Sequence, residues 1–357
     1  DKSMPEAIID PQLAGAEFAR IRLLKGLVIY GANAAGKTNT LNALGTLKSM
    51  VQGSATDLDE GDPTYVQPFK FDPNTPDQPS EFTIRFIVEG VRYHFSLVLN
   101  RERILYESLS AFPKGREQVW YARSWDDSEQ DYTWEPARPT DYRRDANLVK
   151  YTRSNALYLS TAVKFNDEQL RPIYRWFRDK RCLVRMYSDF PSITHEYTGK
   201  QVMADPNRRA QVTRLLQNAD LGILSAEASE TSEIQFLVDE NFDDIPEDIM
   251  QQLVDKKHIK IDFGHKGAKG REYPLQWEKE SSGTQKLFSL SGPWLDILEK
   301  GHTAVLDEID SSMHPIMVHA LLRMVFSNTT NANGAQLVFT THNPLLMDAG
   351  LMRRDQI

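Results

Sequence analysis

Eight consecutive residues near the amino-terminal end combine the residue types that bind a chain of phosphates. They follow an apolar run, 27–30, that predicts a short buried strand, and they precede 39–44, which predicts the first turns of a helix. Glycines at both ends, Gly31 and Gly36, allow the backbone to curl so that successive N–H groups point at an anion, and the helix start adds its positive dipole end. The lysine would reach the β- and γ-phosphates of a nucleotide such as ATP, and the threonine hydroxyl would ligate Mg²⁺. The residues are Gly31, Ala32, Asn33, Ala34, Ala35, Gly36, Lys37 and Thr38, and Thr40 in the following helix is grouped with them.

Two carboxylates and a histidine follow apolar runs in the carboxyl-terminal third. Asp307 and Glu308 come after 303–306, and His342 comes at the end of 336–342. Asp307 is suited to order a water on Mg²⁺ next to Thr38, and Glu308 to accept a proton from the water that attacks the γ-phosphate. His342 is suited to bind the γ-phosphate or hold that water. Taken alone, each of these residues also fits a solvated or structural strand end.

A second anion site is predicted at Ser281, Ser282 and Gly283, where a helix begins that runs towards Glu299. Because the chain already has one phosphate cradle, a second is most useful if it caps the nucleotide held by another copy. The alternative is a plain helix cap, in which a serine side chain binds the first backbone N–H groups.

These residues require elements that bring them together. Buried runs at 303–306 and 336–341 alternate with a helix predicted over 315–327, which indicates a largely parallel sheet. Ligands bind at the carboxyl ends of such strands, and all these polar residues lie there. The fold class predicted is therefore α/β, a P-loop core sheet.

Other segments predict insertions into that core. Apolar residues alternate over 82–88 and 91–99 around Glu89-Gly90, which predicts a β-hairpin, and two further strands are expected over 103–109 and 118–123. A strand over 155–160 is expected to return to the core, followed by helices around 170–177, 212–219 and 243–256, and a hairpin over 258–277. The predicted domains are 1–52 and 257–357 for the core, 53–154 for the β-subdomain and connection, and 155–256 for a helical subdomain.

Composition narrows the class of protein. The chain has 357 residues, 40% apolar and 26% charged, and a net charge of −8, which indicates a globular, soluble protein without a generally basic surface. Cys182 is the only cysteine, so an internal disulfide and a cysteine metal site are excluded, and a cytoplasmic location is expected. No apolar run is long enough for a membrane span. The chain opens without Met and ends in 351–357, which suggests the start of a strand, so we expect the natural protein to extend further.

The order of these motifs resembles the ABC-type ATPase heads, which include SMC proteins, RecF and the OLD-family ATPases. In that resemblance Gly31–Thr38 match the Walker A motif, Asp307 and Glu308 match Walker B and its catalytic glutamate, and His342 matches the switch histidine. Residues 309–312 match the D-loop. Gln67, before Pro68-Phe69, is the candidate Q-loop residue, with an ordinary loop glutamine as the alternative.

The signature segment departs from the transporter form Leu-Ser-Gly-Gly-Gln, because Glu280-Ser281-Ser282-Gly283-Thr284 stands in its place. Together with the Walker motifs, this form looks like the stand-alone bacterial ATPases of anti-phage defence, as in abortive-infection, Septu, retron-associated and PARIS systems. The resemblance implies an ATP- and Mg²⁺-dependent hydrolase. It would act as a homodimer or higher homo-oligomer and control an effector, a nuclease or toxin from the same operon.

Two alternatives remain open. A basic stretch beside Trp176 and Phe177 favours a DNA-repair or recombination ATPase that acts directly on nucleic acid, although a solvated helix face is the simpler explanation. Its residues are Arg171, Arg175, Arg178, Lys180, Arg181 and Arg185. A scaffold that binds nucleotide without hydrolysing it is the other alternative, and Glu308 argues against it. His314 and His319 show no metal-ligand spacing and are expected to be structural.

Overall fold

The structure is a computed structural model of the chain. It describes residues 5–11, 21–135, 140–178, 184–186, 191–219, 222–232, 257–347 and 350–357, without the side chains of 184–186 and 191–194. The chain divides into two compact units, which are described separately. The core unit comprises 1–7, 25–33 and 185–357, and the sheet unit comprises 8–24 and 34–184.

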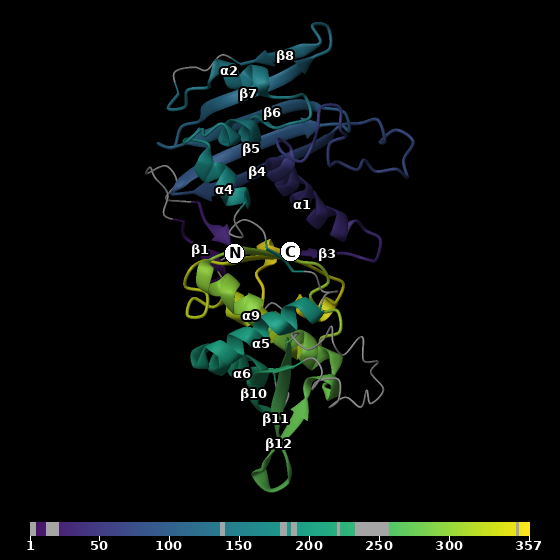
Figure 1. Cartoon of the computed structure of the whole chain (residues 1–357), viewed down its shortest axis with the longest axis vertical. Coiled ribbons are helices and arrows are strands. Elements are labelled where there is room, and N and C mark those ends of the chain that lie inside the picture. Colours follow the sequence, from purple (N-terminus) through teal and green to yellow (C-terminus); the bar gives the residue numbers. More distant parts are fainter. Residues whose placement is uncertain are drawn as a thin grey trace. The chain divides into compact units, whose positions relative to one another are not determined.

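The sheet unit is built on a five-stranded antiparallel sheet (Figure 1). Its strands follow one another in chain order: β4 (Ser80–Val88), β5 (Val91–Leu99), β6 (Ile104–Phe112), β7 (Gln118–Asp126) and β8 (Asp131–Trp134). The β4–β5 hairpin pairs Val88 with Val91, and Glu89 and Gly90 both take the left-handed backbone that a tight hairpin turn requires. The predicted hairpin over 82–99 is confirmed, as are strands close to 103–109 and 118–123.

Four helices pack on one face of this sheet: α1 (Lys37–Gly53), α2 (Ala146–Tyr151), α3 (Tyr158–Lys164) and α4 (Arg171–Arg178). Alternate residues of β5, such as Phe95 and Leu97, share one buried cluster with Met50 of α1, Leu159 of α3 and Phe177 of α4. A short ribbon of β1 (Ile8–Ile9) and β2 (Leu23–Leu24) also belongs to this unit.

The strand expected over 155–160 is wrong, because α3 begins within it at Tyr158. Glu107 on β6 explains the difference. Its buried carboxylate accepts hydrogen bonds from the backbone N–H groups of Tyr158 (2.8 Å) and Leu159 (3.1 Å), so it caps a helix whose own N-cap residue, Leu157, has no side-chain oxygen.

The core unit contains a four-stranded sheet in the order β3-β14-β13-β9. β3 (Gly26–Tyr30), β14 (Gln336–Thr341) and β13 (Thr303–Leu306) run parallel, and β9 (Val184–Met186) lies beyond β13. Helices α9 (Ser282–Lys300) and α10 (Pro315–Phe326) connect to these strands. The parallel core sheet and the inserted antiparallel sheet confirm the predicted α/β fold class.

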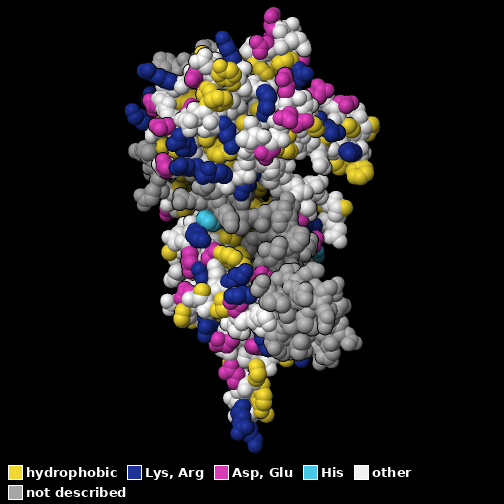
Figure 2. Space-filling model, in the orientation of Figure 1, with side chains coloured by type: hydrophobic (Ala, Val, Ile, Leu, Met, Phe, Trp, Pro, Cys, Tyr) yellow, Lys and Arg dark blue, Asp and Glu magenta, His cyan; other side chains and the backbone are white. Residues whose placement is uncertain are grey.

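Further elements extend the core unit. Helices α5 (Pro191–Ala204) and α6 (Pro206–Asn218) lead into a three-stranded antiparallel sheet of β10 (Ile223–Ser232), β11 (Lys257–Lys266) and β12 (Glu272–Gln276). The predicted hairpin over 258–277 is confirmed, whereas β10 was not expected. The free end of this hairpin is basic, with Lys266, Lys269 and Arg271 exposed (Figure 2). The helix expected over 243–256 lies outside the described residues.

Short 3-10 helices complete the described chain: η1 (Pro5–Ala7), η3 (Ala268–Gly270), η4 (Trp277–Lys279), η5 (Pro344–Leu346) and η6 (Arg354–Gln356). The last of these corrects the expectation of a strand in 351–357. Arg353 forms two hydrogen bonds with the Asp355 carboxylate, and Gln356 donates to the Gly26 carbonyl oxygen, which favours a compact turn over an extended strand. No helix in the described part of the chain has the length and apolar character that a membrane span needs. The predicted domain boundaries stay a prediction.

Candidate functional site

The carboxyl ends of three parallel strands lie side by side in the core unit. Leu306, the last residue of β13, pairs with Phe339 of β14, and Thr341, the last residue of β14, pairs with Tyr30 of β3. Asp307, His342 and Gly31 therefore leave the sheet at one edge. The sequence predicted this edge as the place where an anionic ligand binds, and the register shows that the strand ends meet there.

Thr340 links Asp307 to Glu308 at this edge. Its hydroxyl donates a hydrogen bond to the Asp307 carboxylate and accepts one from the backbone N–H of Glu308 at 2.8 Å. The Thr340 side chain is completely buried, so the hydroxyl exchanges these bonds with no water. Thr340 was not among the predicted site residues. The available signal was a pair of threonines ending an otherwise apolar strand, directly before His342.

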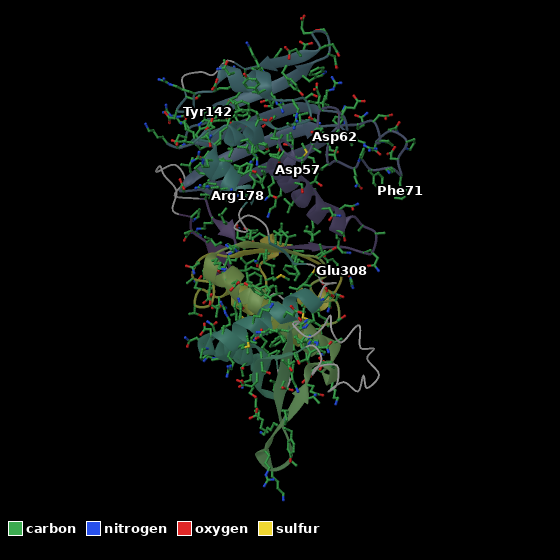
Figure 3. The ribbon with its side chains drawn as sticks, viewed as in Figure 1. Asp57, Asp62, Phe71, Tyr142, Arg178 and Glu308 are labelled. Atoms are coloured by element: carbon green, nitrogen blue, oxygen red, sulfur yellow. The ribbon has the colours of Figure 1, made fainter. Side chains whose placement is uncertain are left out.

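Glu308 has a strained backbone and a half-exposed side chain (Figure 3). Its φ of 47° lies in the left-handed region, which costs a non-glycine residue on the order of 1–3 kcal/mol and is most common at functional sites. In the part of the chain that the structure describes, no hydrogen-bond donor contacts its carboxylate. The arrangement leaves that carboxylate available to accept a proton.

The loop that follows Glu308 is bound to both neighbouring elements. Asp310 accepts a hydrogen bond from the Thr341 hydroxyl at 2.8 Å, and the Ser311 carbonyl oxygen accepts one from the Lys286 ammonium of α9. Asn343, after His342, caps η5 by accepting from the Leu345 N–H at 3.0 Å. His342 itself is exposed.

The predicted signature residues begin helix α9. Ser281 is the N-cap, and its hydroxyl accepts the Thr284 N–H at 3.1 Å, as the helix-cap alternative requires. Ser282 is exposed and Gly283 is buried. Glu280, just before the cap, contacts His265 of β11. A role of Ser281, Ser282 and Gly283 in binding an anion stays a prediction.

The phosphate loop connects the two units, and its halves are described separately. Ala34 and Gly36 take left-handed backbone with φ of 61° and 89°. The left-handed conformation at Ala34 was not expected from the sequence, because glycines were the residues expected to let this backbone curl. A Cβ at Gly36 would meet nothing within 4 Å, so this glycine is required by its φ and not by crowding.

Lys37 and Thr38 begin α1 in the sheet unit, where Gly36 is the N-cap. Thr40 donates from its hydroxyl to the Gly36 carbonyl oxygen at 3.2 Å, so its side chain is used within the helix. The placement of Lys37 and Thr38 against Asp307 stays a prediction, as does the binding of ATP by Ala32, Asn33 and Ala35.

Oxygen ligands of the kind that Mg²⁺ prefers are available in the predicted set, in the Asp307 carboxylate and the Thr38 hydroxyl. Among the described residues no group of three or more His, Cys, Asp or Glu side chains could hold a metal by itself. In P-loop sites, phosphate oxygens of the nucleotide supply further ligands.

The remaining predicted residues lie apart from this edge. Gln67 is exposed in the connection before β4, and His314 caps α10 by accepting the Ile316 N–H at 3.4 Å. Arg175 and Arg178 are exposed on α4, and Arg171 is half-buried there. Lys180 and Arg181 lie outside the described residues.

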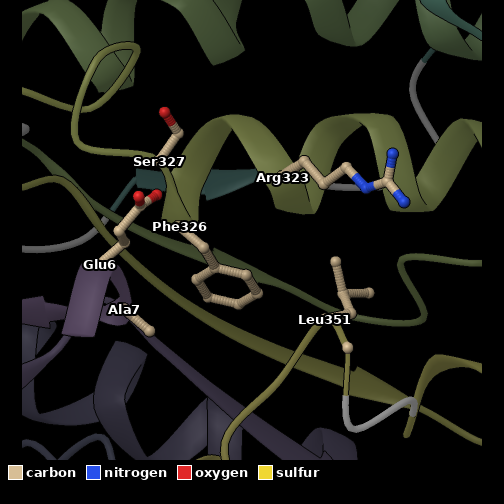
Figure 4. Close-up of a pocket in the computed structure, with 7 residues that line it drawn as sticks. Glu6, Ala7, Arg323, Phe326, Ser327 and Leu351 are labelled. Atoms are coloured by element: carbon tan, nitrogen blue, oxygen red, sulfur yellow. The ribbon is translucent and has the colours of Figure 1, made fainter. Parts of the chain in front are cut away.

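A pocket of about 240 Å³ lies at the opposite end of the core strands (Figure 4). Glu6, Arg323, Phe326 and Leu351 line it. The Phe326 carbonyl oxygen accepts a hydrogen bond from Lys25, the residue directly before β3, so this pocket adjoins the amino ends of the strands. It is separate from the site described above.

Comparison with known proteins agrees with this geometry. Residues 27–348 match the model of the AAA_21 family, described as "AAA domain, putative AbiEii toxin, Type IV TA system". A search of curated proteins found no match. The match covers most of the chain, from β3 through the phosphate loop to η5. The chain therefore belongs to the AAA_21 family, and it is a P-loop ATPase domain of the ABC/SMC-like kind.

Proposed function

We propose that this chain is an ATP-hydrolysing switch that acts as a nucleotide-sandwiched dimer or higher oligomer. The observation that carries the proposal is the alignment of three strand ends, which places Asp307, Glu308 and His342 where the loop from β3 departs. Backbone N–H groups of 31–36, with Lys37, would hold the phosphates. Asp307 and Thr38 would hold Mg²⁺, which when bound neutralises charge on the β- and γ-phosphates.

Glu308 is assigned as the general base of this reaction. Its carboxylate would take the proton of the attacking water while His342 orients the γ-phosphate or that water. The Thr340 hydroxyl binds both the backbone N–H of Glu308 and one carboxylate oxygen of Asp307. It would thereby hold Asp307 as the metal ligand and Glu308 as the general base. Ser281, Ser282 and Gly283 of a second copy would cover the nucleotide.

The test uses two variants of the full chain. Glu308→Gln is expected to retain ATP, to lower turnover by about 10²- to 10⁴-fold, and to accumulate an ATP-bound dimer in size-exclusion chromatography. Lys37→Ala is expected to lose ATP binding. Glu129→Gln, which changes an exposed glutamate in the turn between β7 and β8, is the matched control. Unchanged hydrolysis in both site variants would overturn the proposal, and ATP binding without turnover in the unmodified chain would favour the scaffold alternative.

The proposed output is control of an effector, a nuclease or toxin encoded beside this chain, in anti-phage defence. The family description, which names a toxin, and the form of the motifs support this role. Co-expression of the neighbouring reading frame with the unmodified chain or the Glu308→Gln variant tests it. Growth arrest or nucleic-acid cleavage that differs between the two is the expected result, and identical growth without cleavage would contradict it.

Direct action on DNA is the second candidate, favoured by the exposed Arg175 and Arg178 on α4. Figure 3 labels Arg178. Salt-dependent binding of duplex DNA that weakens when both are changed to glutamine would support it. No binding at low salt would remove it.

A further inference from the structure

The start of α9 contacts the loop after Glu308 through a hydrogen bond and through close packing. Lys286, on the second turn of α9, is only 8% exposed and donates a hydrogen bond to the Ser311 carbonyl oxygen. One turn earlier, Gly283 approaches the same loop so closely that a Cβ there would stand 3.0 Å from the Ser312 carbonyl oxygen. Two neighbouring carbonyl groups of the loop thus rest on one helix start.

The loop itself is a tight, hydrogen-bonded turn. Glu308 and Ser312 both have left-handed backbone, with φ of 47° and 59°. The Ser311 N–H donates to the Glu308 carbonyl oxygen at 2.9 Å, and the Met313 N–H donates to the Asp310 carbonyl oxygen at 3.2 Å. A shift of the Ser311 carbonyl group therefore changes the peptide geometry at Glu308.

The other side of Glu308 is fixed to the sheet. Its N–H is held by Thr340, and the Ile309 N–H donates to the Thr340 carbonyl oxygen at 3.2 Å. Glu308 thus sits between a fixed strand end and a turn whose far side is held by Lys286. Of these two sides, the turn is the one that contacts the helix start, through Lys286 and through Gly283.

We propose that Lys286 is a positioning residue that couples the helix start at Ser281–Gly283 to the Glu308 carboxylate of the same chain. When a nucleotide phosphate of a second copy binds at that helix start, the position of α9 becomes fixed. The Lys286 ammonium then holds the turn in the conformation that orients the Glu308 carboxylate. Each copy thereby gains its own hydrolytic geometry from the nucleotide that its partner holds. This inference rests on the proposed function.

The side chain at 286 suits this task. The ammonium is a charged donor whose hydrogen bond to a carbonyl is stronger than a neutral one, and its burial shields that bond from water. The flexible stem allows the ammonium to follow a small movement of the helix. A methionine would fill the same volume without the donor.

The test compares Lys286→Met, Lys286→Arg and the control Lys300→Met, which removes an exposed lysine at the far end of the same helix. ATP turnover is measured over a range of ATP and protein concentrations, with thermal unfolding to monitor folding. Lys286→Met is expected to lower kcat by about 10- to 100-fold, since misplacing a catalytic group by about 1 Å has this scale of effect. Its KM for ATP should change less than about threefold because the phosphate loop is untouched.

Lys286→Arg restores a charged donor and should recover kcat to within about threefold, and Lys300→Met should match the unmodified chain. Gly283→Ala approaches the same contact from the other side, by pressing on Ser312, and should lower kcat with unchanged melting temperature. The unmodified chain should gain turnover per molecule as its concentration rises, and Lys286→Met should lose this gain.

The outcomes separate the two proposals. An unmodified chain that binds ATP and never hydrolyses it would overturn the proposed function. An active chain in which Lys286→Met keeps full kcat and its concentration dependence would overturn only the coupling. A loss of kcat, KM and melting temperature together, without rescue by arginine, would show that Lys286 is a structural residue and would likewise overturn the coupling.

Discussion

Two glutamates, one in each unit, show opposite uses of the same carboxylate. Glu107 in the sheet unit is completely buried and accepts four hydrogen bonds, from Tyr121, Arg123 and the N–H groups of Tyr158 and Leu159. Glu308 in the core unit is half-exposed, and its carboxylate has no donor among the described residues. A carboxylate whose lone pairs are all occupied can brace a helix start, whereas one left open on a strained backbone can receive a proton.

The residues around Glu107 are also buried and hydrogen-bonded to one another. Arg123 is also fully buried, its guanidinium pairs with Glu107 at 2.9 Å, and Tyr132 lies under it with the ring centroid 4.6 Å away. Beside this pair, the hydroxyl of Tyr142 donates to Asp167 at 2.8 Å and lies 3.0 Å from that of Tyr158. In the sheet unit, these buried polar groups thus hold helices to the sheet. At Glu308, in contrast, the backbone N–H is held by Thr340 while the carboxylate is not.

The largest effect is expected from breaking the buried pair. Arg123→Ala leaves the Glu107 charge buried without its partner, which should lower the free energy of unfolding by about 3–5 kcal/mol in chemical denaturation. The double variant Glu107→Gln/Arg123→Met removes both charges and should recover part of this loss. A change below about 1 kcal/mol in the single variant would contradict the structural role given to the pair.

A smaller effect is expected at the link between the two core carboxylates. Thr340→Val removes the hydroxyl that accepts the Glu308 N–H and donates to Asp307, at a cost of about 1–3 kcal/mol for buried groups left unpaired. Turnover of ATP should fall by about tenfold, the equivalent of about 1.4 kcal/mol.

The conservative variant Thr340→Ser keeps the hydroxyl and serves as the control, with turnover close to that of the unmodified chain. If valine and serine gave the same turnover, the hydroxyl would have no part in positioning Glu308. The contrast between Glu107 and Glu308 would then no longer hold for Glu308.

The smallest effect is a loss of stability at alkaline pH, which appears only above the usual pKa of tyrosine. Burial raises the pKa of Tyr158 to about 12, and burial, with Tyr158 and Asp167 beside it, also raises the pKa of Tyr142. The folded chain then keeps protons that the unfolded chain releases near pH 10, so the free energy of unfolding falls as pH rises above 10. Between pH 6 and 9 these groups contribute no change.

Denaturant titrations at pH 9 and pH 11, with absorbance of ionised tyrosine recorded alongside, measure this effect. Tyr142→Phe removes one of the groups and should reduce the difference between the two pH values. A free energy of unfolding that rises between pH 9 and 11 would contradict the assignment.

Local patterns were sufficient where a segment has one strong preference. The alternation around Glu89-Gly90 predicted the β4–β5 hairpin, and the apolar run ending in Asp307 predicted the strand end that the structure shows. In both cases side-chain periodicity and turn chemistry determine the element, and distant residues only add to it.

Other features depend on residues far along the chain and could not be predicted locally. The segment 155–160 has the composition of a strand, but Glu107 and Arg123 hold its backbone as a helix start, and tertiary contacts override such weak preferences. Thr340 and Lys286 gain their roles only through partners on another element. Ala34 takes a left-handed conformation that glycine adopts more readily, and nothing in its local sequence indicated this.

The contacts of β3 affect when this strand can form during synthesis on the ribosome. Gly26 packs against Phe326 and accepts a hydrogen bond from Gln356, 330 positions away. The antiparallel sheet, in contrast, pairs strands that are neighbours in the sequence and can form while translation continues. β3 must therefore wait, unpaired, until β14 has been translated, so a nascent chain that stops before β14 holds every strand of the antiparallel sheet but lacks the partner of β3.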